Sequence, residues 1–102
     1  MPVQSIQEMS AKLLELCSED DYGSWELWWD VSAEIPADQA PKLKKEFTDL
    51  VSELVSAGKL IPKCHSADGN FAPTQFDREK LVREIDSAAN PDPDSFFWFG
   101  TE

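Results

Sequence analysis

Four stretches of the chain carry apolar residues at the three- and four-residue spacing of an amphipathic helix. The predicted helices span residues 5–17, 24–33, 40–57 and 77–88. Local signals mark their ends: Ser5 and Glu8 have capping-box spacing, Gly58 suits the left-handed residue after a helix, and Asp77 is a good N-cap. Each predicted helix therefore contributes one apolar face to a shared core.

The second predicted helix is apolar over most of its circumference. Trp25, Trp28, Trp29 and Ser32 share one face, and Leu27 and Val31 lie on another. Glu26 and Asp30, four residues apart, form the one polar stripe, and Ser24 can cap the helix. A helix of this kind is mostly buried. We expect Trp28 to be the tryptophan that the fold leaves uncovered.

The hydrophobic period changes after the third helix. Residues 59–66 have strand character, although Pro62 restricts this strand to an edge or a bulge. Asp68-Gly69 is a hairpin turn signal, and residues 71–74 form a short return strand. Because neighbours on a strand point to opposite faces, Cys64 is expected to pack inward and His65 to face outward.

The last stretch, residues 91–102, joins an acidic proline-containing segment to four consecutive aromatics, Phe96 to Phe99. If these rings were exposed to solvent, they would promote aggregation. We expect at least two to dock on the domain, with an added edge strand as one possibility. The predicted fold is mainly α (α+β) in a single domain: a helical core over residues 1–90, with a hairpin near 59–74 in winged-helix-like order, and the docked tail.

Composition narrows the function. The 102 residues are long enough for one domain with its own core. The 20 acids exceed the 9 bases, so the net charge is −11. This charge repels nucleic acid and anionic membranes and attracts basic partners. Neither a secretory signal nor an 18-residue apolar stretch is present, which predicts a cytoplasmic protein with reduced thiols.

Candidate chemistry is sparse. One His and two Cys are too few for a typical zinc site, and nothing in the sequence near Cys64-His65 could orient the histidine as a base. The chain has no glycine-rich phosphate loop and no nucleophile elbow. We therefore predict a protein that is not an enzyme and that uses no cofactor or metal.

A winged-helix order raises the question of DNA binding through the third helix. Lys42, Lys44 and Lys45 open that helix, but acids follow on it. Eight acids and no base lie between Lys12 and Lys42. A groove-binding helix needs a continuous positive face to neutralise phosphates. We therefore predict no direct binding of nucleic acid.

The segment GSWELWWDV, the third helix ending in SAGKLI, and the tail FFWFGTE resemble a family of small, acidic, uncharacterised bacterial proteins. The chain is also similar in kind to immunity proteins of contact-dependent inhibition and other polymorphic toxin systems. The resemblance implies a cytoplasmic protein that binds and blocks one cognate toxin domain, and it transfers no functional residue.

Acidity, clustered aromatics and small size together indicate a protein-binding function, since aromatic side chains anchor interfaces. The hypothesis is an immunity-type inhibitor that occludes a basic toxin domain such as a nuclease. The residues expected to bind this partner are Glu19, Asp20, Asp21, Glu26, Trp28, Asp30 and Glu34. A DNA mimic and a winged-helix-like regulatory module are the alternatives. A monomer and a homodimer, including one with exchanged tails, are both compatible with the sequence.

Overall fold

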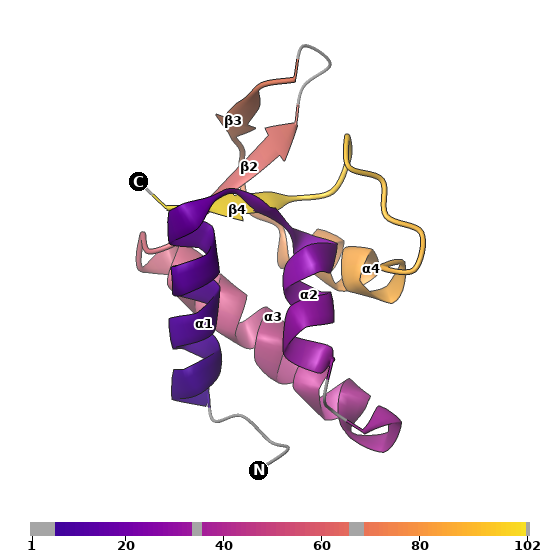
Figure 1. Ribbon diagram of the computed structural model, residues 1–102. Helices are drawn as coiled ribbons and strands as arrows, with labels where there is room; N and C mark the ends of the chain where they lie inside the picture. The colour runs from indigo at the N-terminus through magenta and orange to yellow at the C-terminus, as the bar shows by residue number, and fades with distance from the viewer. Residues whose placement is uncertain (1–5, 34–35, 66–68, 102) are drawn as a thin grey trace.

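The computed structural model describes residues 6–33, 36–65 and 69–101. The elements are α1 (Ile6–Glu19), β1 (Tyr22–Gly23), α2 (Ser24–Ser32), the 3-10 helix η1 (Ala37–Gln39), α3 (Ala40–Ser56), β2 (Ile61–His65), β3 (Phe71–Pro73), α4 (Arg78–Asp86) and β4 (Trp98–Gly100). The predicted α+β class and the order of helices, hairpin and docked tail are confirmed (Figure 1). The predicted cap at Ser5 and part of the predicted turn, at Asp68, lie outside the described residues.

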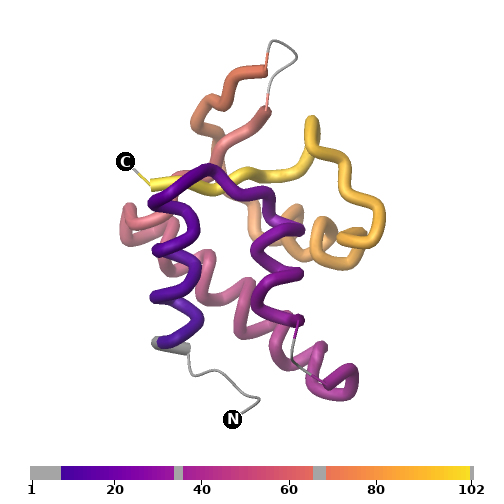
Figure 2. Tube along the Cα trace, in the orientation of Figure 1, coloured from indigo at the N-terminus to yellow at the C-terminus, as the bar shows by residue number. Residues whose placement is uncertain are grey.

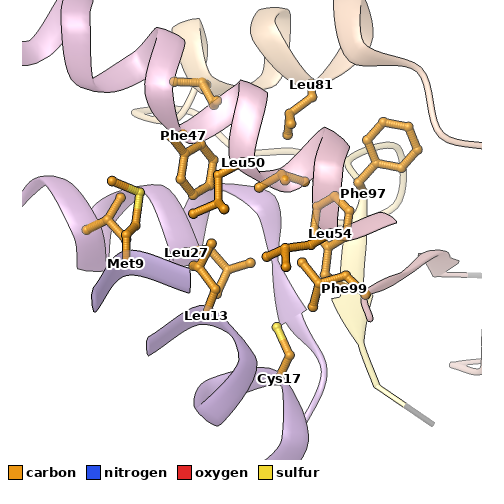
Figure 3. Packing of buried hydrophobic residues seen from close by; sticks show 14 of the residues in the cluster. Met9, Leu13, Cys17, Leu27, Phe47, Leu50, Leu54, Leu81, Phe97 and Phe99 are labelled. Atoms are coloured by element: carbon orange, nitrogen blue, oxygen red, sulfur yellow. The ribbon is translucent and has the colours of Figure 1, made fainter. Parts of the chain in front are cut away.

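The core forms where the apolar faces of the helices meet one side of a small sheet. Helices α1, α2 and α4 all contact α3, and α4 also contacts α2 (Figures 1 and 2). Figure 3 shows side chains from α1, α2, α3, α4 and the tail meeting in this core. The most deeply buried are Met9, Leu13, Leu27, Phe47, Val51, Leu60, Leu81 and Phe99. Each large apolar side chain buried here contributes about 1.5–3 kcal/mol relative to exposure.

Helix α3 supplies the largest apolar face and ends at the residue that the sequence indicates. Gly58 has φ of 75°, a left-handed conformation that costs little without a Cβ. The amides of Lys59 and Leu60 then donate to the carbonyl of Leu54 at 2.9 and 3.2 Å, which satisfies a carbonyl of the last turn. This turn directs the chain back into β2.

The start of α2 differs from the prediction. Gly23, not Ser24, is the N-cap, and the Glu26 carboxylate accepts a hydrogen bond from the Gly23 amide at 3.0 Å. The hydroxyl of Ser24 instead donates to Glu84 of α4 at 2.6 Å. The predicted cap of α4 is confirmed, because the Asp77 carboxylate accepts from the amides of Glu79 and Lys80.

The tail enters the sheet as an inner strand. The strand order is β1-β4-β2-β3, and every neighbouring pair is antiparallel. Docking of at least two tail aromatics is confirmed, since Phe97 and Phe99 are buried. The edge position suggested for the tail is wrong, because β1, a strand of two residues that the sequence did not reveal, pairs with the other side of β4.

The restriction placed on Pro62 is also wrong, because β2 pairs on both sides. The carbonyl of Pro62 accepts from the amide of Thr74 at 2.9 Å, so its nitrogen also faces the β3 side. Strand β3 ends at Pro73, one residue before Thr74. The missing N–H of Pro62 therefore falls where the β2–β3 ladder ends, and few hydrogen bonds are lost.

A buried carboxylate fastens the tail to the helices. Glu84 lies in the core with 3% of its surface exposed. Its Oε1 accepts from the Ser24 hydroxyl at 2.6 Å and from the Phe97 amide at 2.9 Å, while Lys80 pairs with Oε2. The Lys80 ammonium also lies 4.2 Å from the centre of the Phe97 ring. Glu84 thus connects α2, α4 and the tail.

Candidate protein-binding surface

Negative charge is concentrated on the first two helices. Residues 6–33 contain seven carboxylates and one lysine, a formal charge of −6, whereas residues 36–65 contain four carboxylates and five lysines, a charge of +1. The cations of α3 and α4 are largely neutralised in place, by ion pairs such as Lys44–Asp86, Lys45–Asp49 and Arg78–Asp49. The larger part of the net negative charge of the described residues therefore lies on residues 6–33.

One stripe of α1 carries three of these seven acids. Glu8, Lys12, Glu15 and Glu19 follow each other at four- and three-residue spacing, so they share one side of the helix. Glu8, Glu15 and Glu19 are all exposed. Glu15 is not among the residues predicted from the sequence, although its spacing from Glu19 places it on the same side of the helix.

Helix α2 presents its polar stripe next to this side of α1. The Lys12 ammonium lies 3.1 Å from Asp30 Oδ2 and joins the two helices. At 3.6 residues per turn, Glu26, Trp29 and Asp30 occupy one continuous part of the α2 circumference. We call the exposed side formed by these three residues with Glu8, Glu15, Glu19 and Asp20 the α1–α2 acidic face.

The tryptophans of α2 differ from the prediction. Trp28 is half-buried and its ring meets Phe47 edge to face at 5.6 Å, whereas Trp29 is 48% exposed. Leu27 and Val31 point into the core and Trp25 is covered by Phe96 and Trp98 of the tail. This arrangement turns Trp29 toward solvent beside Glu26 and Asp30. The expected uncovered anchor, Trp28, is therefore replaced by Trp29.

The other predicted site residues fall into two groups. Glu19 and Asp20 are exposed, and within the described residues neither is in an ion pair. Asp21 and Glu26 serve the fold: Asp21 Oδ1 lies 2.8 Å from the Lys63 ammonium, and Glu26 caps α2. Glu34 lies outside the described residues. The predicted acids are thus partly brought together on one face and partly used internally.

The Asp21–Lys63 ion pair depends on a glycine in the tail. A Cβ on Gly100 would collide with the Asp21 carboxylate and the Lys63 ammonium. Both partners have roughly four-fifths of their side chains covered, since 23% and 18% are exposed. The pair therefore lies directly over β4 and ties β1 and β2 across it.

The cysteines and the histidine are placed differently from the expectation. Cys64 is exposed and His65 is half-buried, so the predicted inward and outward positions are wrong. The β2–β3 hairpin projects beyond the helices (Figure 1), and Cys64 and the residues of β3 are exposed on it. Asp94 of the tail orients His65, with Oδ1 3.0 Å from Nδ1, a partner that the sequence did not indicate. Cys64 and His65 point to opposite sides of β2.

Burial makes the thiol of Cys17 unreactive. Cys17 is 3% exposed, and desolvation, followed by the nearby Asp21 charge, raises its pKa from 9.0 to about 12, with Lys63 acting in the other direction. The thiolate, which is the nucleophile and metal ligand, is therefore scarce at neutral pH. Among the described residues no group of three or more His, Cys, Asp or Glu is arranged to hold a metal ion.

Comparisons with protein-family models, with curated proteins and with solved structures gave no match to this chain. None of the helices in the described ranges is long and apolar enough to cross a membrane.

Proposed function

We propose that this protein binds a basic protein partner through the α1–α2 acidic face and blocks it by occlusion, as an immunity-type inhibitor of a toxin domain does. The observation that carries the proposal is the position of Trp29, which is 48% exposed between carboxylates on a helix otherwise packed into the core. A large ring held by a rigid helix at the surface is the usual form of an interface anchor.

The charges of the face support a basic partner. Glu15, Glu19 and Asp20 are exposed, and the described residues place no cation in an ion pair with them. Such carboxylates mainly accelerate association with a cationic surface, while burial of an aromatic anchor slows dissociation. An inhibitor needs both effects and needs no catalysis.

The aromatic anchor contributes more to the binding free energy than the ion pairs do. Exposed ion pairs are worth about 0–1 kcal/mol each, whereas a buried interface tryptophan is worth about 2 kcal/mol or more. Loss of Trp29 should therefore weaken binding more than loss of any one carboxylate, and loss of the carboxylates should act chiefly on the association rate.

The experiment is recovery of the partner with the wild-type chain as bait in its native host, followed by binding of the two purified proteins. The Trp29→Ala variant is expected to bind at least about 30-fold more weakly, from the same 2 kcal/mol. Trp28→Phe, at the neighbouring half-buried position, is the matched control and should bind as the wild type does. If Trp29→Ala and the wild type bound the partner with equal affinity, the proposal would be wrong.

A DNA mimic that occupies a nucleic-acid-binding protein is the second candidate, because the same concentration of carboxylates would serve it. Mimicry of phosphates relies on charge and needs no aromatic anchor. Under this alternative, neutralising Glu15 and Glu19 would abolish binding while Trp29→Ala would leave it intact, so the same variants separate the two functions.

A further inference from the structure

Three aromatic side chains from three different strands pack together on the outer face of the sheet. Strand register places Lys63 opposite Trp98 and His65 opposite Phe71, so all four share one face. Phe99, the neighbour of Trp98 on β4, points the other way into the core and is fully buried. The outer face therefore lies on the side of the sheet opposite to the core, and its residues come from the sheet, whereas those of the α1–α2 acidic face lie between Glu8 and Asp30.

The rings are held in place by contacts with each other and with the body of the protein. The Phe71 and Trp98 centroids are 4.8 Å apart, and those of Phe71 and His65 are 5.1 Å apart. Trp98 also meets Trp25 of α2 at 5.1 Å, and its indole N–H donates to the Pro93 carbonyl at 2.9 Å. Phe71 nevertheless keeps 37% of its surface exposed, so a fixed ring is presented to solvent.

The charge beside these rings is negative. Asp94, whose side chain is 78% exposed, reaches His65 Nδ1 through Oδ1 at 3.0 Å. A carboxylate can accept about four hydrogen bonds, so one contact leaves it able to take further donors. The Lys63 ammonium, the cation on this face, is 2.8 Å from Asp21 and is neutralised there. A ligand at the rings therefore meets aromatic faces and an available carboxylate.

We propose that this surface, formed by His65, Phe71, Trp98 and Asp94, binds an arginine side chain of a basic partner. A guanidinium group is planar, stacks on aromatic rings and donates two parallel hydrogen bonds to a carboxylate. Lysine can supply the charge but not the planar stack. The inference rests on the proposed function for the basic character of the partner, and it adds a second contact point with its own specificity.

The surface can be tested with a small probe before any partner is known. The peptide Ac-Gly-Arg-Arg-Gly-NH₂ is titrated into the full ¹⁵N-labelled chain at low ionic strength, with the same peptide carrying citrulline in place of arginine as the uncharged control. The expected result is a saturable shift of the Trp98 indole N–H and of the Phe71 and His65 amides that the citrulline peptide does not produce.

Two variants separate stacking from charge. Phe71→Leu keeps an apolar side chain at the edge of the sheet and removes the aromatic face, and Asp94→Asn removes only the charge. Each should weaken the arginine peptide about two- to fivefold, as expected for an exposed cation–π contact or surface ion pair. Glu79→Gln, an exposed acid on α4, is the control and should leave the affinity unchanged.

The proposal is overturned if both variants bind the arginine peptide as the wild type does, or if the peptide shifts only signals of α1 and α2. If Phe71→Leu does not fold, the affinity of Asp94→Asn for the arginine peptide tests the proposal alone. A peptide that shifts only signals of α1 and α2 would leave the proposed function standing, because it would place the cation on the α1–α2 acidic face. Conversely, a native partner indifferent to Trp29→Ala would overturn the proposed function without changing the peptide titration.

Discussion

Replacement of Glu84 by alanine should release the tail and destabilise the whole domain. Glu84 Oε1 is the acceptor for both the Ser24 hydroxyl and the Phe97 amide. Both donors are buried, and each donor left unsatisfied costs about 1–3 kcal/mol. Lys80 loses its carboxylate partner as well, but its ammonium keeps the Ser95 carbonyl as an acceptor, and its side chain is 35% exposed and can be hydrated.

The expected loss for Glu84→Ala is therefore about 3–5 kcal/mol, the range typical when one partner of a buried ion pair is removed. This is a large part of the roughly 5–15 kcal/mol available to a domain. Glu84→Gln should cost less, about 1–2 kcal/mol, because the amide oxygen can still accept from Ser24 and Phe97 and only the bond to the Lys80 charge is lost.

Urea unfolding followed by far-ultraviolet circular dichroism and by tryptophan fluorescence measures these free energies. Hydrogen exchange of the Phe97 and Phe99 amides reports separately on the tail. Glu53→Gln, an exposed acid on α3, is the control and should change stability by less than about 0.5 kcal/mol. If Glu84→Ala costs less than about 1 kcal/mol and leaves exchange of the tail amides unchanged, the buried carboxylate does not hold the tail.

Three further predictions concern other contacts. Trp25→Ala should cost about 3–5 kcal/mol and Trp29→Ala less than about 1 kcal/mol in the same urea assay, since one ring is buried and the other is 48% exposed; similar losses would contradict the placement of α2. Gly100→Ala should lower the free energy of unfolding by about 1 kcal/mol, because the added Cβ displaces the Asp21–Lys63 ion pair. In a chain that already carries Asp21→Asn the same substitution should cost less, and additive losses would exclude coupling between Gly100 and the ion pair. Because burial raises the pKa of Cys17 from 9.0 to about 12, the folded chain retains the Cys17 proton that the unfolded chain loses, so this stabilisation is complete below pH 9 and is lost as pH rises toward 12. Unfolding free energies across that range should fall less steeply for Cys17→Ala than for wild type, and a thiol reagent at pH 8 should label only Cys64; rapid labelling of Cys17 would contradict its burial.

The positions of the helices could be predicted from residues close together in the sequence. The spacing of Leu43, Phe47 and Leu54 predicts the buried face of α3, and Gly58 and Asp77 mark helix ends that the structure confirms. These features depend on residues within a few positions of each other, so one sequence contains the information needed.

The sheet could not be predicted in the same way. One of its two inner strands, β4, comes from four consecutive aromatics, which have no alternation to show which side faces the core. Trp98 pairs with Gly23, far away in the sequence, and β1 is only two residues long. The choice of an inner position for β4 depends on these distant partners and on the buried acceptor, Glu84.

The candidate surface was only partly predictable. Helix α2 is apolar over most of its circumference, so periodicity could not decide which tryptophan faces solvent, and Trp29 was missed. Two signals were present and were not used. Glu15 lies four residues before Glu19, and Glu84 stands three residues after Leu81 on the buried side of α4, where an acid requires a partner.

The proposed binding of a basic partner by the α1–α2 acidic face is best tested by the association rate constant with that partner at two salt concentrations. Glu15→Gln with Glu19→Gln should slow association several-fold at low ionic strength and little at high ionic strength. Glu53→Gln with Glu79→Gln removes the same charge from α3 and α4 and should leave the rate nearly unchanged. Equal slowing by both pairs would show that association depends on net charge alone, and slowing by neither pair would show that the partner binds another surface; either result would exclude the proposed role of the α1–α2 acidic face.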